Sequence, residues 1–260
     1  MKNIVLFAPH QDDEVISAFL YLHEQKQKGN KVSVIFATNG DYKGREIAAI
    51  RAKESIKALS RIGLSKDDIY FMGYADTGMR STHSFLFRLY HSEIKQVLSA
   101  PYSNSTYHPL NGKTVHHIFH GKETPYTKES FFYDIQMIIE LLQPDVLLIP
   151  SCLDFHSGHQ VLGKIILEIV KSNHLRIPIY SYLIHAGDDW GWPNRNGNTF
   201  LRPEIISEQV WERRMIFSYP TKEVEQKKEA IQVFITQQPS SQNGYLNSFA
   251  KEEEIFWIEG

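Results

Sequence analysis

The sequence predicts an α/β protein with a Rossmann-like, mostly parallel sheet flanked by helices. Short runs of Val, Ile and Phe alternate along the chain with longer segments whose apolar residues recur at helical spacing. Strands that alternate with helices form βαβ units, and these units build parallel sheets. The chain has 260 residues, of which 42% are hydrophobic, so we expect one domain over residues 1–260 with a sizeable core.

The first βαβ unit occupies the start of the chain. The first strand covers residues 4–7 and ends at or before Pro9, which has no N–H to donate to a sheet ladder. From Asp13 the apolar positions change to a helical period. This helix extends to Gly29, a residue type that suits the left-handed turn after a helix. Residues 31–37 form the second strand.

The remaining elements continue the alternation, with two irregular regions. The pattern predicts helices at residues 45–61, 84–98, 128–142 and 159–171, and strands at residues 68–72, 145–149 and 179–184. Residues 101–127 are a long irregular insertion, rich in His and Tyr, that we expect to wall a pocket. Residues 188–193 are expected to shape the same pocket. The C-terminal part is predicted to be helical, with residues 251–254 as a solvent-exposed helix face.

Composition narrows the possible partners. The formal net charge is −2 with acids and bases mixed, so nucleic acid is not an expected partner. Cys152 is the only cysteine, which rules out a disulfide framework. No apolar run approaches the ~20 residues of a membrane span, and no leader-like stretch precedes the first strand. We therefore expect a soluble cytoplasmic protein, whose oligomeric state the sequence does not indicate.

Polar residues gather just past the carboxyl ends of the predicted strands. In open parallel sheets, ligand sites form at this edge. Each residue alone has the plainer interpretation of a helix cap or a turn residue, but their shared edge predicts a site. The residues are Asp12, Asp13, Asp41, Asp76, Asp154, His156, His159 and His185.

The densest polar stretch of this edge follows the first strand. His10 and Asp13 lie three residues apart across a tight turn, so one ion can contact both, and His159 begins a later helix at the same edge. Two imidazoles and one carboxylate are a usual catalytic zinc set with a position left for water. Asp12 would take the proton of that metal-bound water. His156 would stabilise an oxyanion or protonate a leaving amine.

Five stretches resemble motifs of the PIG-L/LmbE-like zinc-dependent N-acetylglucosaminyl deacetylases. They are APHQDDE at residues 8–14, RAKE at 51–54, GYADTGM at 73–79, QPD at 143–145 and DFHSGH at 154–159. The first is highly specific, because it is similar to the family's Ala/Pro-His-Pro-Asp-Asp-Glu motif, and the others are supportive. The resemblance covers most of the chain.

This resemblance implies a Rossmann-like fold and hydrolysis of an N-acyl group, typically acetyl from an amino sugar or glycoconjugate. It implies that His10, Asp13 and His159 hold zinc, that Asp12 is the general base and that His156 stabilises the oxyanion. A His/Asp/His set also accepts Fe²⁺ and other divalent metals.

Three further residues are candidates for substrate binding: Arg51, Asp76 and His185. Arg51 matches a family position that contacts substrate. The alternatives are an exposed helix arginine, a turn cap at Asp76 and a satisfied strand-end histidine at His185.

Two residues depart from the family's motifs. Gln11 replaces a proline, which should loosen the turn without removing a ligand. Gly158 replaces an acid that orients a histidine in the family. Asp154 is a hypothetical substitute for that acid as the partner of His156.

Other functions remain as alternatives. An amidase acting on a larger sugar or thiol conjugate would use the same zinc site, and a non-catalytic metal- or ligand-binding protein would keep only the fold. A phosphoryl-accepting receiver domain would leave the two histidines at 156 and 159 unexplained. A dinucleotide-binding protein would need a Gly-rich loop after the first strand, which this chain lacks.

Overall fold

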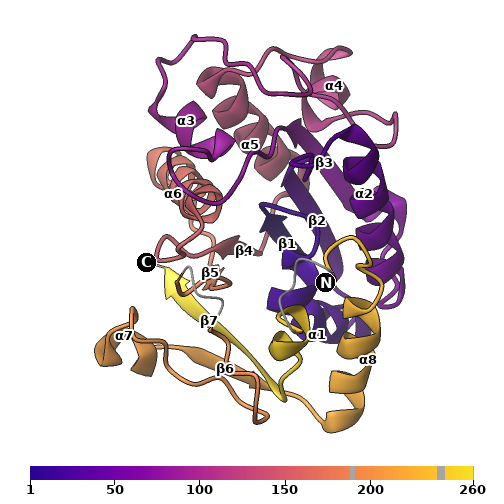
Figure 1. Cartoon of the computed structure of the whole chain (residues 1–260), viewed down its shortest axis with the longest axis vertical. Helices are drawn as coiled ribbons and strands as arrows, with labels where there is room; N and C mark the ends of the chain where they lie inside the picture. Colours follow the sequence, from indigo (N-terminus) through magenta and orange to yellow (C-terminus); the bar gives the residue numbers. More distant parts are fainter. Residues whose placement is uncertain (188–190, 239–243, 260) are drawn as a thin grey trace.

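A seven-stranded sheet forms the centre of the part of the chain that the structure describes (Figure 1). The structure is a computed structural model that describes residues 1–187, 191–238 and 244–259. The strand order is β3-β2-β1-β4-β5-β7-β6. The strands are β1 (Asn3–Ala8), β2 (Lys31–Thr38), β3 (Ile69–Tyr74), β4 (Val146–Pro150), β5 (Ile179–Tyr182), β6 (Met215–Ser218) and β7 (Glu253–Glu259).

The strand order reverses between β1 and β4. Strands β1, β2 and β3 are parallel and extend to one side, while β4 and β5 are parallel and extend to the other. At the far edge of the described sheet, β7 pairs antiparallel with both β5 and β6. In open α/β sheets, the crevice outside the carboxyl ends at such a reversal is the usual ligand site.

Helices cover both faces of this sheet (Figure 1). The α-helices are α1 (Asp13–Gln27), α2 (Arg45–Ser60), α3 (Phe85–His91), α4 (Val115–His120), α5 (Lys128–Leu142), α6 (Ser157–Ser172), α7 (Glu208–Glu212) and α8 (Thr221–Ile231), with 3₁₀ turns at Lys66–Asp68 and Leu246–Phe249. In β1, Leu6 packs with the core residues of α1, α2 and α8, whereas Val5 and Phe7 pack with those of α3, α5 and α6. Both faces are apolar, as a covered parallel sheet requires.

The predicted α/β class is confirmed, and most elements lie where the sequence placed them. The helix expected at residues 84–98 is shorter, because α3 ends at His91. The C-terminal part contains β6 and β7 in addition to two helices. The expectation that residues 251–254 form an exposed helix face is wrong, since Lys251 and Glu254 are buried and Glu253 begins β7.

The two irregular regions were expected to shape a pocket. Residues 101–127 contain the short helix α4. Within the 188–193 loop, Trp192 is buried and stacks on Phe200 at 5.5 Å between ring centroids, while residues 188–190 lie outside the described residues. None of the helices in the described part combines the length and apolar character needed to cross a bilayer.

Candidate active site

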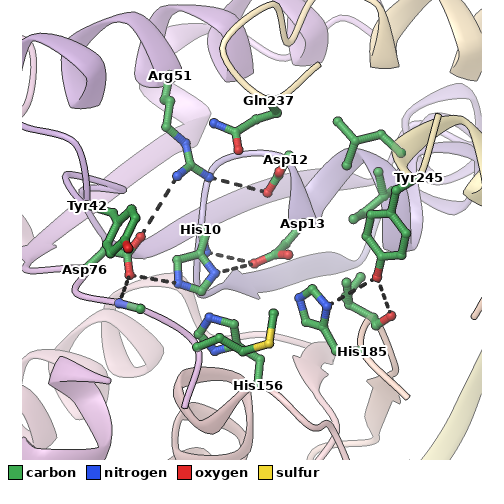
Figure 2. A pocket seen from close by; sticks show the side chains of 15 residues that line it. His10, Asp12, Asp13, Tyr42, Arg51, Asp76, His156, His185, Gln237 and Tyr245 are labelled. Carbon is green, nitrogen blue, oxygen red and sulfur yellow. Dashed lines mark hydrogen bonds and ion pairs between the residues drawn. The ribbon is translucent and has the colours of Figure 1, made fainter. Parts of the chain in front are cut away.

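A pocket of about 340 Å³ opens at the carboxyl edge of the sheet, where β1 and β4 end (Figure 2). It contains seven of the eight residues that the sequence predicts as metal ligands, catalytic groups or substrate contacts: His10, Asp12, Asp13, Arg51, Asp76, His156 and His185. The eighth, His159, is fully buried and lies against His10, with its Nε2 3.2 Å from Nδ1 of His10. The structure therefore brings together side chains from the ends of β1, β3, β4 and β5.

The turn between β1 and α1 has an unusual backbone. Asp12 adopts φ 134° and ψ −30°, a region that side-chain-bearing residues rarely occupy and that costs about 1–3 kcal/mol. Its N–H donates to Oε2 of Glu14, and its carbonyl accepts from Val15 N and Ile16 N. The Asp12 side chain makes no capping hydrogen bond. Capping of α1 therefore does not explain this carboxylate, which instead lines the pocket.

Three donor atoms converge beneath the pocket floor. Asp13 Oδ2 lies 3.4 Å from His10 Nδ1 and 3.4 Å from His159 Nε2, and the two ring nitrogens are 3.2 Å apart. Ligands at 2.0–2.1 Å from a tetrahedral zinc ion lie about 3.4 Å from one another. The triangle of His10, Asp13 and His159 thus fits one tetrahedral metal ion. A nitrogen of His156 also lies within 4.8 Å of nitrogens on both histidines, so the cluster is compatible with a metal site.

Each histidine of this triangle has a carboxylate behind it. Nε2 of His10 lies 3.7 Å from Asp76 Oδ1, and Nδ1 of His159 lies 3.3 Å from Asp154 Oδ2. Such carboxylates orient histidine ligands and raise their basicity. The hypothesis that Asp154 partners the ring of His156 is wrong, because Asp154 meets only the backbone N–H of His156 and turns its other oxygen to His159.

The ring of His156 is held by the backbone of Gly158. The Gly158 N–H donates to His156 Nδ1 at 3.0 Å, which leaves Nε2 to carry the proton of the neutral ring. Burial, together with the neighbouring His10 and His159, keeps the pKa of His156 well below its ordinary value. A Cβ at position 158 would lie 3.1 Å from Cε1 of His156. Glycine thus leaves room for the ring, and His156 lines the pocket as a neutral hydrogen-bond donor.

Arg51 and Gln11 fasten the strained turn. Nη2 of Arg51 donates to Gln11 O at 2.9 Å and lies 3.6 Å from Asp12 Oδ1. Arg51 is only 8% exposed, so the alternative of an exposed helix arginine is wrong. Gln11 is buried and donates through Nε2 to Thr38 O at 2.8 Å. This bond ties the turn to β2, which contradicts the expectation that Gln11 loosens it.

Neighbouring acids of the site have pKa values shifted in opposite directions. Burial raises the pKa of Asp12 to about 7, although Arg51 opposes the shift. Burial also disfavours the charge on Asp13, but His159 and His10 outweigh it and lower the Asp13 pKa. Burial lowers the pKa of His185 to about 4, although the negative charge of Asp154 opposes this shift. Such contrasts within one cleft are typical of functional sites.

Several pocket residues were not predicted from the sequence. Gln237, Tyr245 and Leu246 come from the C-terminal part, where no motif marks them. Tyr245 Oη donates to the carbonyl of Ile184 at 2.9 Å and lies 3.2 Å from Nδ1 of His185. Tyr42 also lines the pocket, and its position just past the end of β2 was a usable signal.

The irregular insertion supports this site from outside. No residue of 101–127 is among the described residues that line this pocket. The segment instead lines a separate pocket beside α2, through Pro109, Leu110 and Asn111. Its link to the site is Tyr107, whose Oη donates to Asp41 Oδ2 at 2.8 Å. Asp41 in turn accepts the backbone N–H of Asp76 at 2.7 Å. The insertion therefore acts on the pocket through Asp41 and Asp76.

Comparison with known families finds one match. The family described as PIG-L, GlcNAc-PI de-N-acetylase, matches residues 5–170. The match runs from β1 into α6, and it includes every predicted site residue except His185. No curated protein sequence is significantly similar to this chain.

Solved structures share the fold at low identity. A deacetylase–bog complex from the teicoplanin biosynthesis pathway has 14% identity and a TM-score of 0.60, over 98% of this chain and 96% of that chain. The N,N'-diacetylchitobiose deacetylase from Pyrococcus horikoshii has 19% identity and a TM-score of 0.60, over 99% and 84%. A 4-carboxy-2-hydroxymuconate hydratase from Pseudomonas putida has 14% identity and a TM-score of 0.51, over 96% and 83%. Because one fold carries both reactions, the chemistry must be argued from the site.

Proposed function

Because the chain belongs to the PIG-L family, we propose that it is a metal-dependent hydrolase that removes an N-acetyl or other N-acyl group from an amino-sugar-containing substrate. One observation carries this proposal. A triangle of metal-donor atoms, a raised-pKa carboxylate and a neutral histidine donor all meet at one pocket. These are the parts that hydrolysis of an unactivated amide requires.

We assign His10, Asp13 and His159 as the metal ligands. Their 3.2–3.4 Å separations and their nitrogen–carboxylate composition fit Zn²⁺, and the donor set also suits Fe²⁺. When bound, the metal supplies a Lewis acid that polarises the amide carbonyl and lowers the pKa of water to about 7. Asp76 and Asp154, behind the two histidines, keep the rings in place.

Asp12 is the general base in this proposal. Its carboxylate faces the pocket beside the metal ligands, which is where a base for a metal-bound water must lie. It accepts the proton of the attacking water and passes it to the amine nitrogen as the C–N bond breaks. Arg51 holds the turn that carries Asp12. Arg51 and Asp76 on one side of the pocket and His185 on the other are the proposed substrate-binding residues.

His156 stabilises the tetrahedral oxyanion in this proposal. The Gly158 N–H occupies Nδ1, so the Nε2–H of the neutral ring is the donor available to the developing negative charge. A donor fixed in place before the reaction acts without reorganisation cost. We also infer that residues 1–260 work as one catalytic domain, because Tyr245 and Leu246 of the C-terminal part line the same pocket as the N-terminal motif.

Metal analysis and acetate release test this proposal together. Tag-free protein is reconstituted with Zn²⁺ or Fe²⁺, and its metal content is measured by mass spectrometry beside His159→Ala and, as a matched control, the exposed His120→Ala. We expect near one metal ion per chain in the wild type and the control, with loss in His159→Ala. Only the metal-bearing proteins should release acetate from N-acetylated amino sugars. Wild-type protein that binds no divalent metal after reconstitution would refute the proposal.

A further inference from the structure

The two sides of the pocket differ in exposure and polarity, and we propose that they receive different halves of the substrate. The acyl group lies on an enclosed apolar side formed by Ile16, Ile184, Tyr245 and Leu246, and the amine component lies on an open polar side at Tyr42. The substrate class that follows is a short-chain N-acyl group on an amine component of unrestricted size. This inference rests on the proposed hydrolase function and adds size limits to it.

The apolar side is closed off by packed side chains. Among the described lining residues, Ile16, Ile184, Tyr245 and Leu246 are each at most 4% exposed. Tyr245 is anchored through its hydroxyl to the Ile184 carbonyl, and its ring lies parallel to that of His185 at 6.0 Å. A long acyl chain would have to displace these groups, and overfilling a packed apolar space is unfavourable.

The opposite side is open and polar. In Figure 2, Tyr42 and Asp76 lie across His10 from Tyr245 and His185. Tyr42 is 59% exposed, so the pocket meets solvent here. The neighbouring Arg51 and Asp76 add charged groups that suit hydroxyl-bearing ligands, and the exposed ring of Tyr42 offers an aromatic surface of the kind that packs on sugars.

The position of the base decides which half lies on which side. In amide hydrolysis the water oxygen forms the new C–O bond, the C–N bond breaks, and the water proton passes through Asp12 to the nitrogen. The second water proton also ends on the nitrogen, so the products are a carboxylate and a protonated amine. Asp12 Oδ1 lies 3.6 Å from Nη2 of Arg51, and Nη1 of Arg51 lies 4.0 Å from Asp76 Oδ2. Asp12 is thus on the Arg51–Asp76 side of the pocket. The nitrogen must therefore face the Arg51–Asp76 side, and the acyl substituent on the carbonyl carbon points the other way, towards Ile184 and Leu246.

Two substrate series test this assignment in the zinc-loaded wild type. The first extends the acyl group of glucosamine from acetyl to propionyl, butyryl and hexanoyl. The second keeps the acetyl group and enlarges the amine component from N-acetylglucosamine to its benzyl glycoside and its disaccharide. We expect kcat/KM to fall at least tenfold from acetyl to butyryl, and to fall less than threefold across the second series.

Variants on each side of the pocket test the two halves of the assignment separately. Leu246→Ala should raise the butyryl-to-acetyl ratio of kcat/KM at least tenfold, because it enlarges the enclosed side. The milder Ile184→Val should move the ratio in the same direction, which keeps the test valid should Leu246→Ala not fold. Tyr42→Ala is the matched control on the open side. It should raise KM for the disaccharide and leave the acyl ratio within twofold of wild type.

A binding measurement gives a readout that does not depend on turnover. Calorimetric titration with straight-chain carboxylates should show acetate binding at least tenfold more tightly than hexanoate in the wild type, with that preference reduced in Leu246→Ala. Equal hydrolysis of acetyl and hexanoyl substrates, or an acyl ratio that responds to Tyr42→Ala and not to Leu246→Ala and Ile184→Val, would overturn the two-sided assignment alone. Failure of metal-loaded protein to hydrolyse any member of either series would overturn the hydrolase function itself.

Discussion

Two clusters of buried charge in this molecule differ in what surrounds them. One joins Lys227 of α8 to Glu254 of β7, with 2.7 Å between Nζ and Oε1 and no exposure of either side chain. Lys227 also donates to Ile16 O, and Glu254 accepts the backbone N–H groups of Leu20 and Tyr21. Each charged group is surrounded by partners, so the cluster fastens α8 and β7 to α1.

The cluster at the pocket is arranged differently. Asp12, Asp13 and Asp76 crowd around His10 at the rim and floor of a pocket. Burial drives the pKa of Asp12 to about 7, whereas nearby histidines lower that of Asp13. Asp13 and Asp76 have several partners each, as Glu254 has, but both line a pocket together with Asp12. The comparison shows that access to a pocket, more than burial or the number of partners, separates a candidate reactive site from a structural ion pair.

The sharpest test of this contrast is Asp12→Asn, which removes the proposed base and keeps the shape of the side chain. We expect kcat/KM to fall about a thousandfold, while metal content and the free energy of unfolding stay close to wild type. Acetate release and urea unfolding measure the two properties on the same preparation. Activity within tenfold of wild type would show that Asp12 is not the base.

The converse test is Lys227→Met, which leaves the Glu254 carboxylate buried without its partner. We expect a loss of about 3 kcal/mol in the free energy of unfolding, measured by urea denaturation, with kcat of the folded fraction unchanged. Arg61→Met is the matched control, because the Arg61–Glu229 pair is exposed and should contribute less than about 1 kcal/mol. Equal losses in the two variants would contradict the structural role of the buried pair.

Removal of the metal should make the free energy of unfolding depend on pH through His10. Burial disfavours the charge on His10, but Asp76 and Asp13 outweigh it and raise its pKa to about 10. A raised folded-state pKa contributes stability that is complete below pH ~6.5 and is lost as pH rises through about 10. Burial also raises the pKa of Glu14 to about 8, so we compare variants: chelator-treated wild type should lose about 2 kcal/mol more between pH 7 and pH 9 in urea unfolding than chelator-treated His10→Ala.

Two control proteins test whether His10 causes this pH dependence. The metal-loaded protein should lack most of this slope, because a metal-bound histidine is neutral across the range. In the chelated state, His10→Ala should lack the part of the slope that His10 contributes and keep the part that Glu14 contributes. An unchanged slope in His10→Ala would assign the effect to other groups.

The smallest expected effect concerns Gly158→Ala. The added Cβ would lie 3.1 Å from Cε1 and 3.2 Å from Nδ1 of His156, so the ring must shift by a few tenths of an ångström. We expect kcat to fall about tenfold, equal to about 1.4 kcal/mol, with KM and metal content unchanged. A loss of metal in place of a loss of kcat would show that residue 158 supports the ligands and not the oxyanion donor.

The sequence by itself determined the α/β class and the shared edge of the site. Apolar runs and helical periods are local, and the carboxyl ends of parallel strands meet at one edge by geometry. His10, Asp13 and His159 could therefore be grouped although 149 residues separate the outer two. Their roles as ligands remain predictions that metal analysis decides.

Only the tertiary structure decided the partners of the polar residues. Gln11 was expected to loosen a turn that it fastens, because its partner Thr38 O comes from another strand. Asp154 meets the ring of His159 in place of that of His156, a choice that spacing along the chain does not reveal. Glu254 was expected on an exposed helix, since charged residues are usually solvated. It is buried in β7 because packing brings Lys227 and the backbone of α1 to it, and such long-range pairing leaves no trace in local sequence pattern.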